Sequence, residues 1–452
     1  MIKIIIVLLF GFVYVISLIP YLNIKEKKIK NNIQNVSVIV FATVFGLLFP
    51  INYILSIKGF NSKSYIDAYL IFDEFDLLKY YFAIFLVSHT FLLVLKRKKE
   101  INLYTNEHEC DNNYFYSKKI IYTVYIVFFI GLISNILYLK AYGSYNNYLN
   151  YSGLIRSGVF QIDNKFSFLF PFRNCIIFSS YLFAIMKKRT KNKIINTIFL
   201  IISILLSVSI LYANKGRLSI ILYIVLLILA LSKEKNKQYI NIIELLKVAL
   251  IGLIGGISIL LIGQLMGRNN ETSFVFLLNK EISFSFINFK KICNYCSLDN
   301  FRYFFDIIAS LVFILPSSIW SAKFNIVSAS TINTIAWFGS EKGANGIYGE
   351  MPIDFISLSY MQFGFLGIII LPLVWANFYN YLIKKIEKTI KEKSLKLFIE
   401  KYIIITIGIQ SLFYADPYLI INREFGFIIF ILIYYFLMII ENNKANKKRR
   451  IK

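Results

Sequence analysis

The amino-acid sequence predicts an all-α, polytopic membrane protein, and its composition, its apolar runs and the placement of its charge lead to that fold class. Of the 452 residues, 57% are hydrophobic and only 17% are charged, whereas soluble domains carry about a quarter charged residues. Runs such as Ile194–Tyr212 and Phe425–Ile440 are long enough, or nearly so, to cross ~30 Å of hydrocarbon as a helix. Lipid offers the backbone no hydrogen-bond partners, so repeated spans must be helical.

The positive charge is distributed as it is in membrane proteins. The formal net charge of +25 would favour a nucleic-acid partner in a soluble protein. Here the basic residues lie between alternate apolar segments, as the positive-inside rule predicts for cytoplasmic loops. The basic runs are Lys25–Lys30, Lys96–Lys99, Lys187–Lys193, Lys233–Lys237, Lys384–Lys396 and Lys444–Lys452. Membrane topology therefore explains the charge, and nucleic acid is not expected as a partner.

About eleven spans are expected, with the N-terminus outside, the C-terminus cytoplasmic and every basic run inside. Met1–Leu22 is taken as the first span because no small-residue cleavage site follows it and its basic run comes after it. The spans are predicted at Ile2–Leu22, Val36–Ile57, Leu77–Leu95, Ile120–Leu139, Phe166–Met186, Ile194–Tyr212, Leu218–Leu231, Ile242–Met266, Phe355–Phe378, Phe398–Tyr414 and Phe425–Ile440. Residues 1–452 are read as a single transmembrane domain.

A large external loop is predicted over Gly267–Asp354. Within it, Tyr303–Trp320 is apolar but is interrupted by Asp306 and Pro316. Counting it as a twelfth span would place Lys384–Lys396 outside. We therefore expect an amphipathic or re-entrant helix there, lying at the membrane interface. In the eighth span, small residues are predicted to form one face on which a neighbouring helix packs closely; they are Gly252, Gly256, Gly263 and Gly267.

Several arginines lie near the predicted outer face, where the positive-inside rule does not explain them. They are Arg156, Arg173, Arg217, Arg268, Arg302 and Arg423. Arginine grips phosphate oxygens with a rigid, permanently charged fork. Lys215 and Arg217 occupy a tight turn between two spans, where they either hold an anionic lipid-linked substrate or reach to lipid headgroups.

The other outer arginines also have alternative interpretations. Arg156 lies in a predicted polar external loop, where it either binds an anion or is a solvated surface charge, and both are equally open. Arg423 either binds an anion or pairs with the adjacent Glu424. Arg268 and Arg302 are read as solvated loop charges.

Three outer carboxylates are candidate general bases: Glu350, Asp354 and Asp416. Glu350 and Asp354 are four residues apart and would share one face of a helix, although Pro352 lies between them. A carboxylate in a partly apolar pocket can have its pKa raised toward neutrality and accept a hydroxyl proton. The alternative is a solvated acid that only marks the start of a span. The Cys293 and Cys296 pair forms a local disulfide or two free thiols, and no second ligand pair supports a zinc site.

Three short motifs occur together: the turn Lys215-Gly216-Arg217, a Pro316…Trp320…Lys323 stretch, and Gly349-Glu350 leading into Tyr360–Gly367. In this order they resemble the Wzy-type oligosaccharide repeat-unit polymerases, which make O-antigen and capsule. The chain departs from one pattern of that family, because none of its arginines is followed by glycine after ten intervening residues.

The resemblance implies a metal-independent glycosyltransferase without a cofactor, on a GT-C-like helical scaffold in the bacterial plasma (inner) membrane. A glycan would leave undecaprenyl diphosphate and join another lipid-linked repeat unit at the outer face. Glu350 or Asp354 would deprotonate the acceptor hydroxyl. The cations expected to hold the diphosphate or substrate are Arg156, Lys215, Arg217, Lys323 and Arg423. The implied partners are the undecaprenyl diphosphate-linked oligosaccharide, the lipid bilayer, a chain-length regulator and a flippase.

Two other functions remain open on the sequence alone. An O-antigen ligase shares this topology, but such enzymes use a histidine in the large loop, and Gly267–Asp354 contains none. A lipid-linked oligosaccharide flippase or other transporter would have short outer loops and charged residues lining a path inside the spans. The predicted spans here are nearly free of charge.

Overall fold

A computed structural model of the chain describes residues 2–25, 28–30, 33–97, 117–157, 164–187, 193–214, 217–232, 239–240, 274–312, 315, 326–390 and 392–450. Within these ranges, seven helices are long and apolar enough to cross a membrane. They are Ile2–Tyr21, Ile33–Ile57, Glu74–Lys96, Lys118–Lys140, Ser167–Met186, Lys193–Ala213 and Phe365–Thr389. An eighth candidate is the pair Pro417–Arg423 and Phe425–Glu441, which is bent by 63°. The chain is therefore a helical, multi-pass membrane protein, as the hydropathy predicted.

The N-terminal part of the described chain contributes five α-helices. They are α1 (Ile2–Leu18), α2 (Ile33–Phe41), α3 (Phe49–Ile57), α4 (Lys63–Leu70) and α5 (Glu74–Arg97). The 3-10 turn η1 (Ile19–Tyr21) extends α1, and the π-helical segment η2 (Ala42–Leu48) joins α2 to α3. A π-helical turn is rare and usually short. Its presence here gives one continuous helix over the predicted second span.

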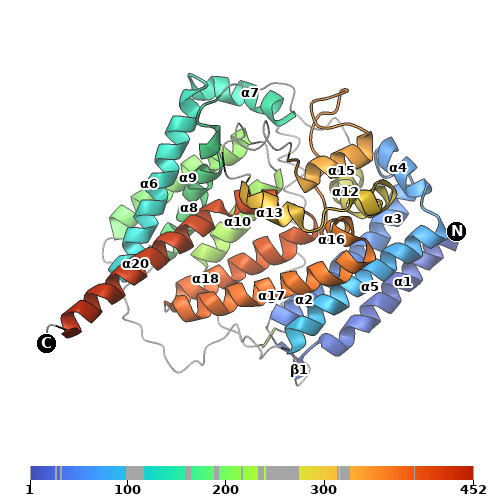
Figure 1. The fold of residues 1–452 in the computed structure, drawn as a ribbon, viewed down its shortest axis with the longest axis horizontal. Coiled ribbons are helices and arrows are strands. Elements are labelled where there is room, and N and C mark those ends of the chain that lie inside the picture. The colour runs from blue at the N-terminus through green and yellow to red at the C-terminus, as the bar shows by residue number, and fades with distance from the viewer. Residues whose placement is uncertain are drawn as a thin grey trace.

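The middle part adds α6 (Lys118–Lys140), α7 (Tyr145–Ser157), α8 (Asn174–Met186), α9 (Lys193–Ala213) and α10 (Arg217–Leu231). Two 3-10 turns, η3 (Ser167–Leu169) and η4 (Pro171–Arg173), precede α8. Figure 1 shows α6 to α10 gathered with the C-terminal helix on one side of the molecule, and α1 to α5 on the other. The predicted seventh span coincides with α10, an apolar helix shorter than the other spans.

Short strands connect two segments that were both predicted to lie in the cytoplasm. They are β1 (Ile24–Lys25), β2 (Lys28–Lys30) and β3 (Tyr239–Ile240). The order is β1-β2-β3, both pairs are antiparallel, and Ile29 pairs with Ile24 on one side and Ile240 on the other. The sheet therefore joins the turn after the first span to the segment after α10.

The predicted external loop is largely helical where the structure describes it. It contains α12 (Phe274–Tyr295), the 3-10 turn η5 (Leu298–Asn300), α13 (Phe305–Val312) and α15 (Ala329–Phe338). Helix α12 buries Phe286, Ile287 and Phe289 and packs against α3, α15 and α16 (Phe355–Phe363). Hydropathy missed α12 because an amphipathic helix interleaves polar and apolar residues along the sequence. This segment is thus part of the helical core.

Helix α13 lies in the range where an amphipathic or re-entrant helix was expected. Its buried side carries Asp306 and Ser310, while Ile308 and Leu311 are exposed. A helix with its polar side buried and its apolar side exposed suits contact with lipid. The predicted eighth span, Ile242–Met266, and the glycine face from Gly252 to Gly267 lie outside the described residues.

The predicted ninth span needs correction, because Phe355–Phe378 is not one helix. Helix α16 ends at Phe363, Gly364 has φ +61°, and α17 (Phe365–Thr389) begins after it. The Phe355 and Trp375 rings lie 6.1 Å apart, so α16 folds back beside α17. Glycine adopts positive φ without steric cost, and a hydropathy profile does not detect such a reversal.

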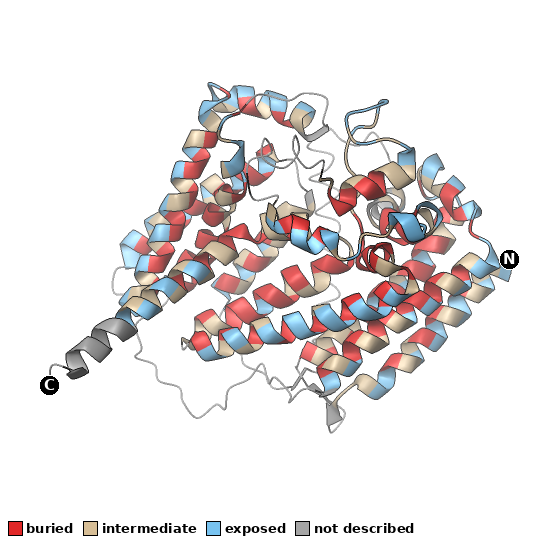
Figure 2. Ribbon diagram, in the orientation of Figure 1, coloured by how far each residue is buried: buried red, intermediate tan, exposed pale blue. Residues whose placement is uncertain are grey.

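The C-terminal part contains α18 (Lys393–Ile403), the π-helical η6 (Ile404–Ile409), the 3-10 turn η7 (Gln410–Leu412), α19 (Pro417–Arg423) and α20 (Phe425–Arg450). The first three are continuous and cover most of the predicted tenth span. Figure 2 shows that the helices bury one side and expose the other. Phe12, Leu205 and Phe436 are 64–66% exposed. Exposed large apolar side chains on long helices are expected where lipid surrounds them.

Candidate functional site

Two carboxylates from distant parts of the chain meet the first turn of α15. Asp416 Oδ2 accepts a hydrogen bond from the Ser330 backbone amide at 2.9 Å. Glu350 Oε1 accepts from Ser328 Oγ at 3.1 Å and from Thr331 Oγ1 at 2.8 Å. The first amides of a helix are unpaired and carry partial positive charge. The N-terminus of α15 therefore gathers both acids in one place.

Asp416 is a buried acid that holds two helix ends together. It is 1% exposed, and its Oδ1 accepts from the Tyr418 amide at 2.9 Å, which caps α19. Burial raises the pKa of Asp416 to about 6, and hydrogen bonds from Ser330 partly oppose that rise. The adjacent Ala415 amide donates to the carbonyl of Ile353 at 2.8 Å. This contact brings Asp416 next to the segment that carries Asp354.

Asp354 is the N-cap of α16. Its Oδ1 accepts from the amides of Ile356 and Ser357, each at 3.0 Å, and its Oδ2 accepts from Ser357 Oγ at 2.5 Å. Burial raises its pKa to about 6, against these hydrogen bonds. Because both oxygens are occupied by the first turn of the helix, Asp354 acts as a structural cap and is poorly placed to take a proton from a substrate.

Residues 350–354 have no regular secondary structure, so Glu350 and Asp354 do not share a helix face. Two buried asparagines hold this segment against the core. Asn333 Nδ2 donates to the carbonyls of Met351 and Pro352, at 3.2 and 3.1 Å, and Asn288 Nδ2 donates to the carbonyl of Pro352 at 2.9 Å. The backbone around Glu350 is thereby fixed, while Asp354 turns away into α16.

Glu350 has the geometry of a general base. Two hydroxyls orient its Oε1, and within the described part of the chain no group donates to its Oε2. The side chain is half-buried, which leaves Oε2 accessible. A base must reach the proton it accepts within hydrogen-bond distance, and of the three acids only Glu350 presents an oxygen in this way.

Arg302 is not the solvated loop charge that the sequence suggested. Its Nη2 lies 2.9 Å from Oδ1 of the buried Asp306, and it donates to the carbonyl of Val327 at 3.0 Å. Gln362 Nε2 donates to the other oxygen of Asp306 at 2.9 Å. The pair therefore ties α13 to α16 and to the residues that precede α15. The pair thus holds elements that flank the acid site, and the charge of Arg302 is already neutralised by Asp306.

The predicted substrate-binding cations are not assembled by the described residues. Arg423 Nε pairs with the buried Glu424 at 2.7 Å, and its Nη2 donates to the Thr406 carbonyl at 2.9 Å. Pairing with Glu424 is thus the arrangement that this arginine adopts. Arg156 lies in the last turn of α7 and Arg217 opens α10, but their side chains are outside the described set. Lys215 and Lys323 lie outside the described residues altogether.

Arg173 is the cation that the sequence did not single out. It is 1% exposed; Nε donates to Asn135 Oδ1 and Nη1 donates to Tyr148 Oη, each at 2.9 Å. The guanidinium carbon lies 4.5 Å from the centroid of the Tyr138 ring. Its burial depends on side chains from η3–η4, and from α6 and α7, which are distant in sequence. The only local signal of a buried arginine is therefore the aromatic-rich stretch that precedes it.

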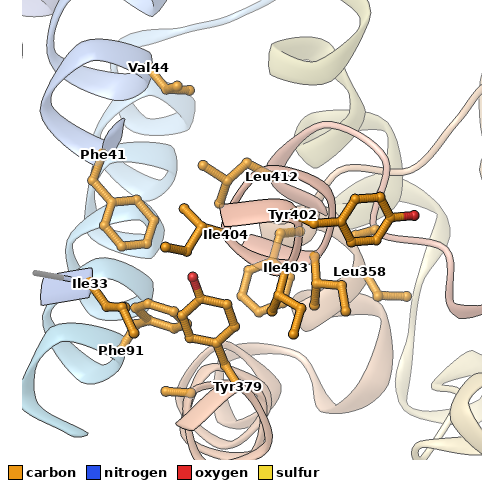
Figure 3. Packing of buried hydrophobic residues seen from close by; sticks show 14 of the residues in the cluster. Ile33, Phe41, Val44, Phe91, Leu358, Tyr379, Tyr402, Ile403, Ile404 and Leu412 are labelled. Atoms are coloured by element: carbon orange, nitrogen blue, oxygen red, sulfur yellow. The ribbon is translucent and has the colours of Figure 1, made fainter. Parts of the chain in front are cut away.

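A small apolar cavity of about 30 Å³ lies among α2, α5, α17 and η6. Figure 3 shows Phe41, Phe91, Tyr379 and Ile404 converging from these four elements. The lining also includes Phe355, next to Asp354, and Leu412, four residues before Asp416. The lining of the cavity thus approaches the chain segments that carry the acids.

Within the described residues, no group of three or more His, Cys, Asp or Glu side chains is arranged to hold a metal ion. Cys293 and Cys296 are free thiols. Comparison of the chain with protein-family models, with characterised proteins and with solved structures gave no significant match.

Proposed function

We propose that this protein is a metal-independent glycosyltransferase that polymerises lipid-linked oligosaccharide repeat units at the outer face of the bacterial plasma membrane, on a GT-C-like scaffold. The observation that carries the proposal is the Glu350 carboxylate. One of its oxygens is fixed by two hydroxyls, the other is open, and it lies at the N-terminus of α15 beside the buried Asp416. The multi-pass helical fold and the motifs that resemble the polymerases support the same assignment.

In the proposed reaction, Glu350 takes the proton of an acceptor hydroxyl. The hydroxyl oxygen attacks the anomeric carbon of the donor glycan and forms the new glycosidic bond. The bond between that carbon and the diphosphate breaks, and its electron pair leaves with undecaprenyl diphosphate. Proton transfer by a positioned carboxylate contributes about 10²–10⁴-fold to a rate of this kind. Outer-face cations would stabilise the charge on the departing diphosphate.

The test is polymerisation of a defined undecaprenyl diphosphate-linked repeat unit by purified protein in liposomes. We expect Glu350→Gln to lose products longer than one repeat by about 10²-fold or more, because the amide still accepts the two hydroxyl hydrogen bonds but takes no proton. Glu341→Gln is the matched control, since Glu341 is an exposed acid in the turn after α15. Normal chain lengths from Glu350→Gln would contradict the proposal.

The same assay separates the alternative functions. A product joined to a core oligosaccharide acceptor, and not to another repeat unit, would identify a ligase. Movement of the lipid-linked repeat between leaflets without a new glycosidic bond would identify a transporter.

A further inference from the structure

Arg173 is a buried cation whose hydrogen bonding is incomplete. We call the groups around its guanidinium the Arg173 box: Asn135, Tyr138, Tyr148 and Phe170. Asn135 and Tyr148 accept from Nε and Nη1, and the three aromatic rings lie 4.5 to 5.6 Å from the guanidinium carbon. The remaining nitrogen, Nη2, is buried and has no hydrogen-bond partner.

No carboxylate in the described part of the chain forms an ion pair with Arg173. Among the described residues, its acceptors are a neutral amide oxygen and a neutral phenol. A buried charge is unfavourable unless it is paired and its donors are satisfied. Aromatic faces attract the cation but do not occupy the free N–H groups of Nη2. The box therefore lacks one component, and the chemistry of that component is an anion with oxygen acceptors.

The position of the box connects it to the predicted phosphate-binding turn. Tyr148 Oη accepts from Arg173 and donates to Asn214 Oδ1 at 3.2 Å. Asn214 directly precedes Lys215 in the sequence, and Tyr148 lies on α7, the helix that ends with Arg156 and Ser157. The Arg173 box thus shares α7 with Arg156 and contacts the residue that precedes Lys215.

On its other side, the box adjoins the C-terminal helices. Asn174 Nδ2 donates to the carbonyl of Asn422 at 2.6 Å, and the Phe172 and Phe425 rings lie 4.6 Å apart. Helix α19 begins directly after its cap, Asp416, and ends at this junction. Its seven residues span about 10 Å. One short helix therefore leads from the acid site to the Arg173 box.

We propose that Arg173 binds a diphosphate, with Nη2 donating to a phosphate oxygen. The proposal rests on the function proposed above and names the residue that holds the leaving group of that reaction. Guanidinium forks match phosphate oxygens in geometry and charge, and a diphosphate satisfies both the empty donor and the unpaired charge.

The test measures binding and stability, without turnover. Purified protein in phosphatidylcholine nanodiscs is titrated with undecaprenyl diphosphate or with inorganic diphosphate, and melting temperature and binding are recorded. We expect both probes to raise the melting temperature of the wild type, and Arg173→Met to weaken binding at least tenfold. Arg173→Lys should restore part of it, because the charge returns without the fork.

A second readout excludes a purely structural role. Without ligand, Arg173→Met should melt at the wild-type temperature or above. Methionine has a volume similar to that of arginine, and the substitution removes a buried, unneutralised charge. Arg302→Met is the matched control and should melt lower, because it leaves the buried Asp306 unpaired. A large loss of stability in Arg173→Met would overturn the proposal.

Three outcomes separate this inference from the proposed function. Undiminished diphosphate binding by Arg173→Met overturns the inference, even if polymerisation is confirmed. Stabilisation by phosphatidylglycerol as large as that by either diphosphate probe also overturns it, because the box would then bind ordinary headgroups. Arg173-dependent diphosphate binding by a protein that makes no glycan supports the inference and contradicts the polymerase.

Discussion

Asp416 and Ser330 are 86 positions apart in the sequence, yet the Asp416 carboxylate accepts a hydrogen bond from the Ser330 amide at 2.9 Å. This contact joins the start of α19 to the first turn of α15. It also fixes the turn that orients Glu350 through Ser328 and Thr331. A buried acid therefore helps to position the proposed base.

The pKa of Asp416 makes the stability of the protein dependent on pH. Burial raises this pKa from 3.8 to about 6, so the folded state binds the proton more tightly than the unfolded state does. The destabilisation is complete above pH 6 and disappears as the pH falls toward 3.8. A difference of this size corresponds to about 3 kcal/mol. We expect the melting temperature in detergent to rise as the pH is lowered from 7 to 5.

Asp416→Asn isolates this contribution. At pH 7 the variant escapes the destabilisation by the buried charge, but its amide satisfies Ser330 or Tyr418 and not both, at a cost of about 1–3 kcal/mol, so the two effects oppose each other there. Its gain on acidification should be smaller than that of the wild type. Asp299→Asn, at an exposed position, should behave as the wild type. Equal acid stabilisation of the wild type and Asp416→Asn would show that Asp416 does not titrate in this range.

The reversal between α16 and α17 depends on close packing at Gly367. A Cβ there would lie 2.1 Å from the Ser359 carbonyl oxygen, which is backbone and cannot move aside easily. We expect Gly367→Ala to destabilise the protein by about 1–3 kcal/mol, measured as a lower melting temperature. Leu366→Ala is the control, since Leu366 is 66% exposed and should have a much smaller effect. Similar losses in both would mean that α16 does not pack on α17 in this way.

The turn that follows α15 is predicted to lie outside the cell. The test is to label Ser340→Cys in intact cells with a membrane-impermeant maleimide. We expect labelling without permeabilisation. Burial raises the pKa of Cys293 to about 12 and that of Cys296 to about 11, and the thiolate is the reactive form. These native thiols should therefore give little background. Labelling that requires permeabilisation would place this turn, and the acid site with it, in the cytoplasm.

Arg217→Ala should leave the protein inserted in the membrane but abolish long glycan chains, with single-repeat product remaining. Loss of a donor that stabilises a leaving oxyanion costs about 10²–10³-fold in rate. The measurement is the chain-length distribution on a gel, beside Arg97→Ala from a predicted cytoplasmic basic run, which should give normal lengths. Long chains from Arg217→Ala would remove this turn from the mechanism.

The hydropathy of the sequence was sufficient to locate the apolar spans, because a helix that crosses a membrane requires a long run of apolar residues. It located α1, α5, α6 and α9 to within a few residues. It failed for α12, whose polar residues are buried and paired: Asn279 and Ser283 hydrogen-bond with Asn52. That partnership joins residues more than 200 positions apart, and no local pattern records it.

The candidate site was predictable only in part for the same reason. Glu350, Asp354 and Asp416 were recognisable as outer carboxylates near predicted span ends, but their roles depend on which amides and hydroxyls reach them. Arg173 carried no stronger signal than the arginines around it, because its burial requires aromatic rings from other segments. The sequence indicated residue type and nearness to a span, while long-range packing determined which groups are free to react.

The π-helical segment η6 (Ile404–Ile409) sets the angular phase of the residues that follow it. A π turn holds more residues than an α turn, so this segment absorbs an additional residue while the α-helical faces on either side keep their phase. A further residue inserted there would not be absorbed, and it would rotate the residues that follow by about 100° around the helix axis. Asp416 would then be directed away from α15 although its own neighbours in sequence are unchanged, so a single-residue insertion within an apolar membrane segment would disrupt a polar site several residues beyond it.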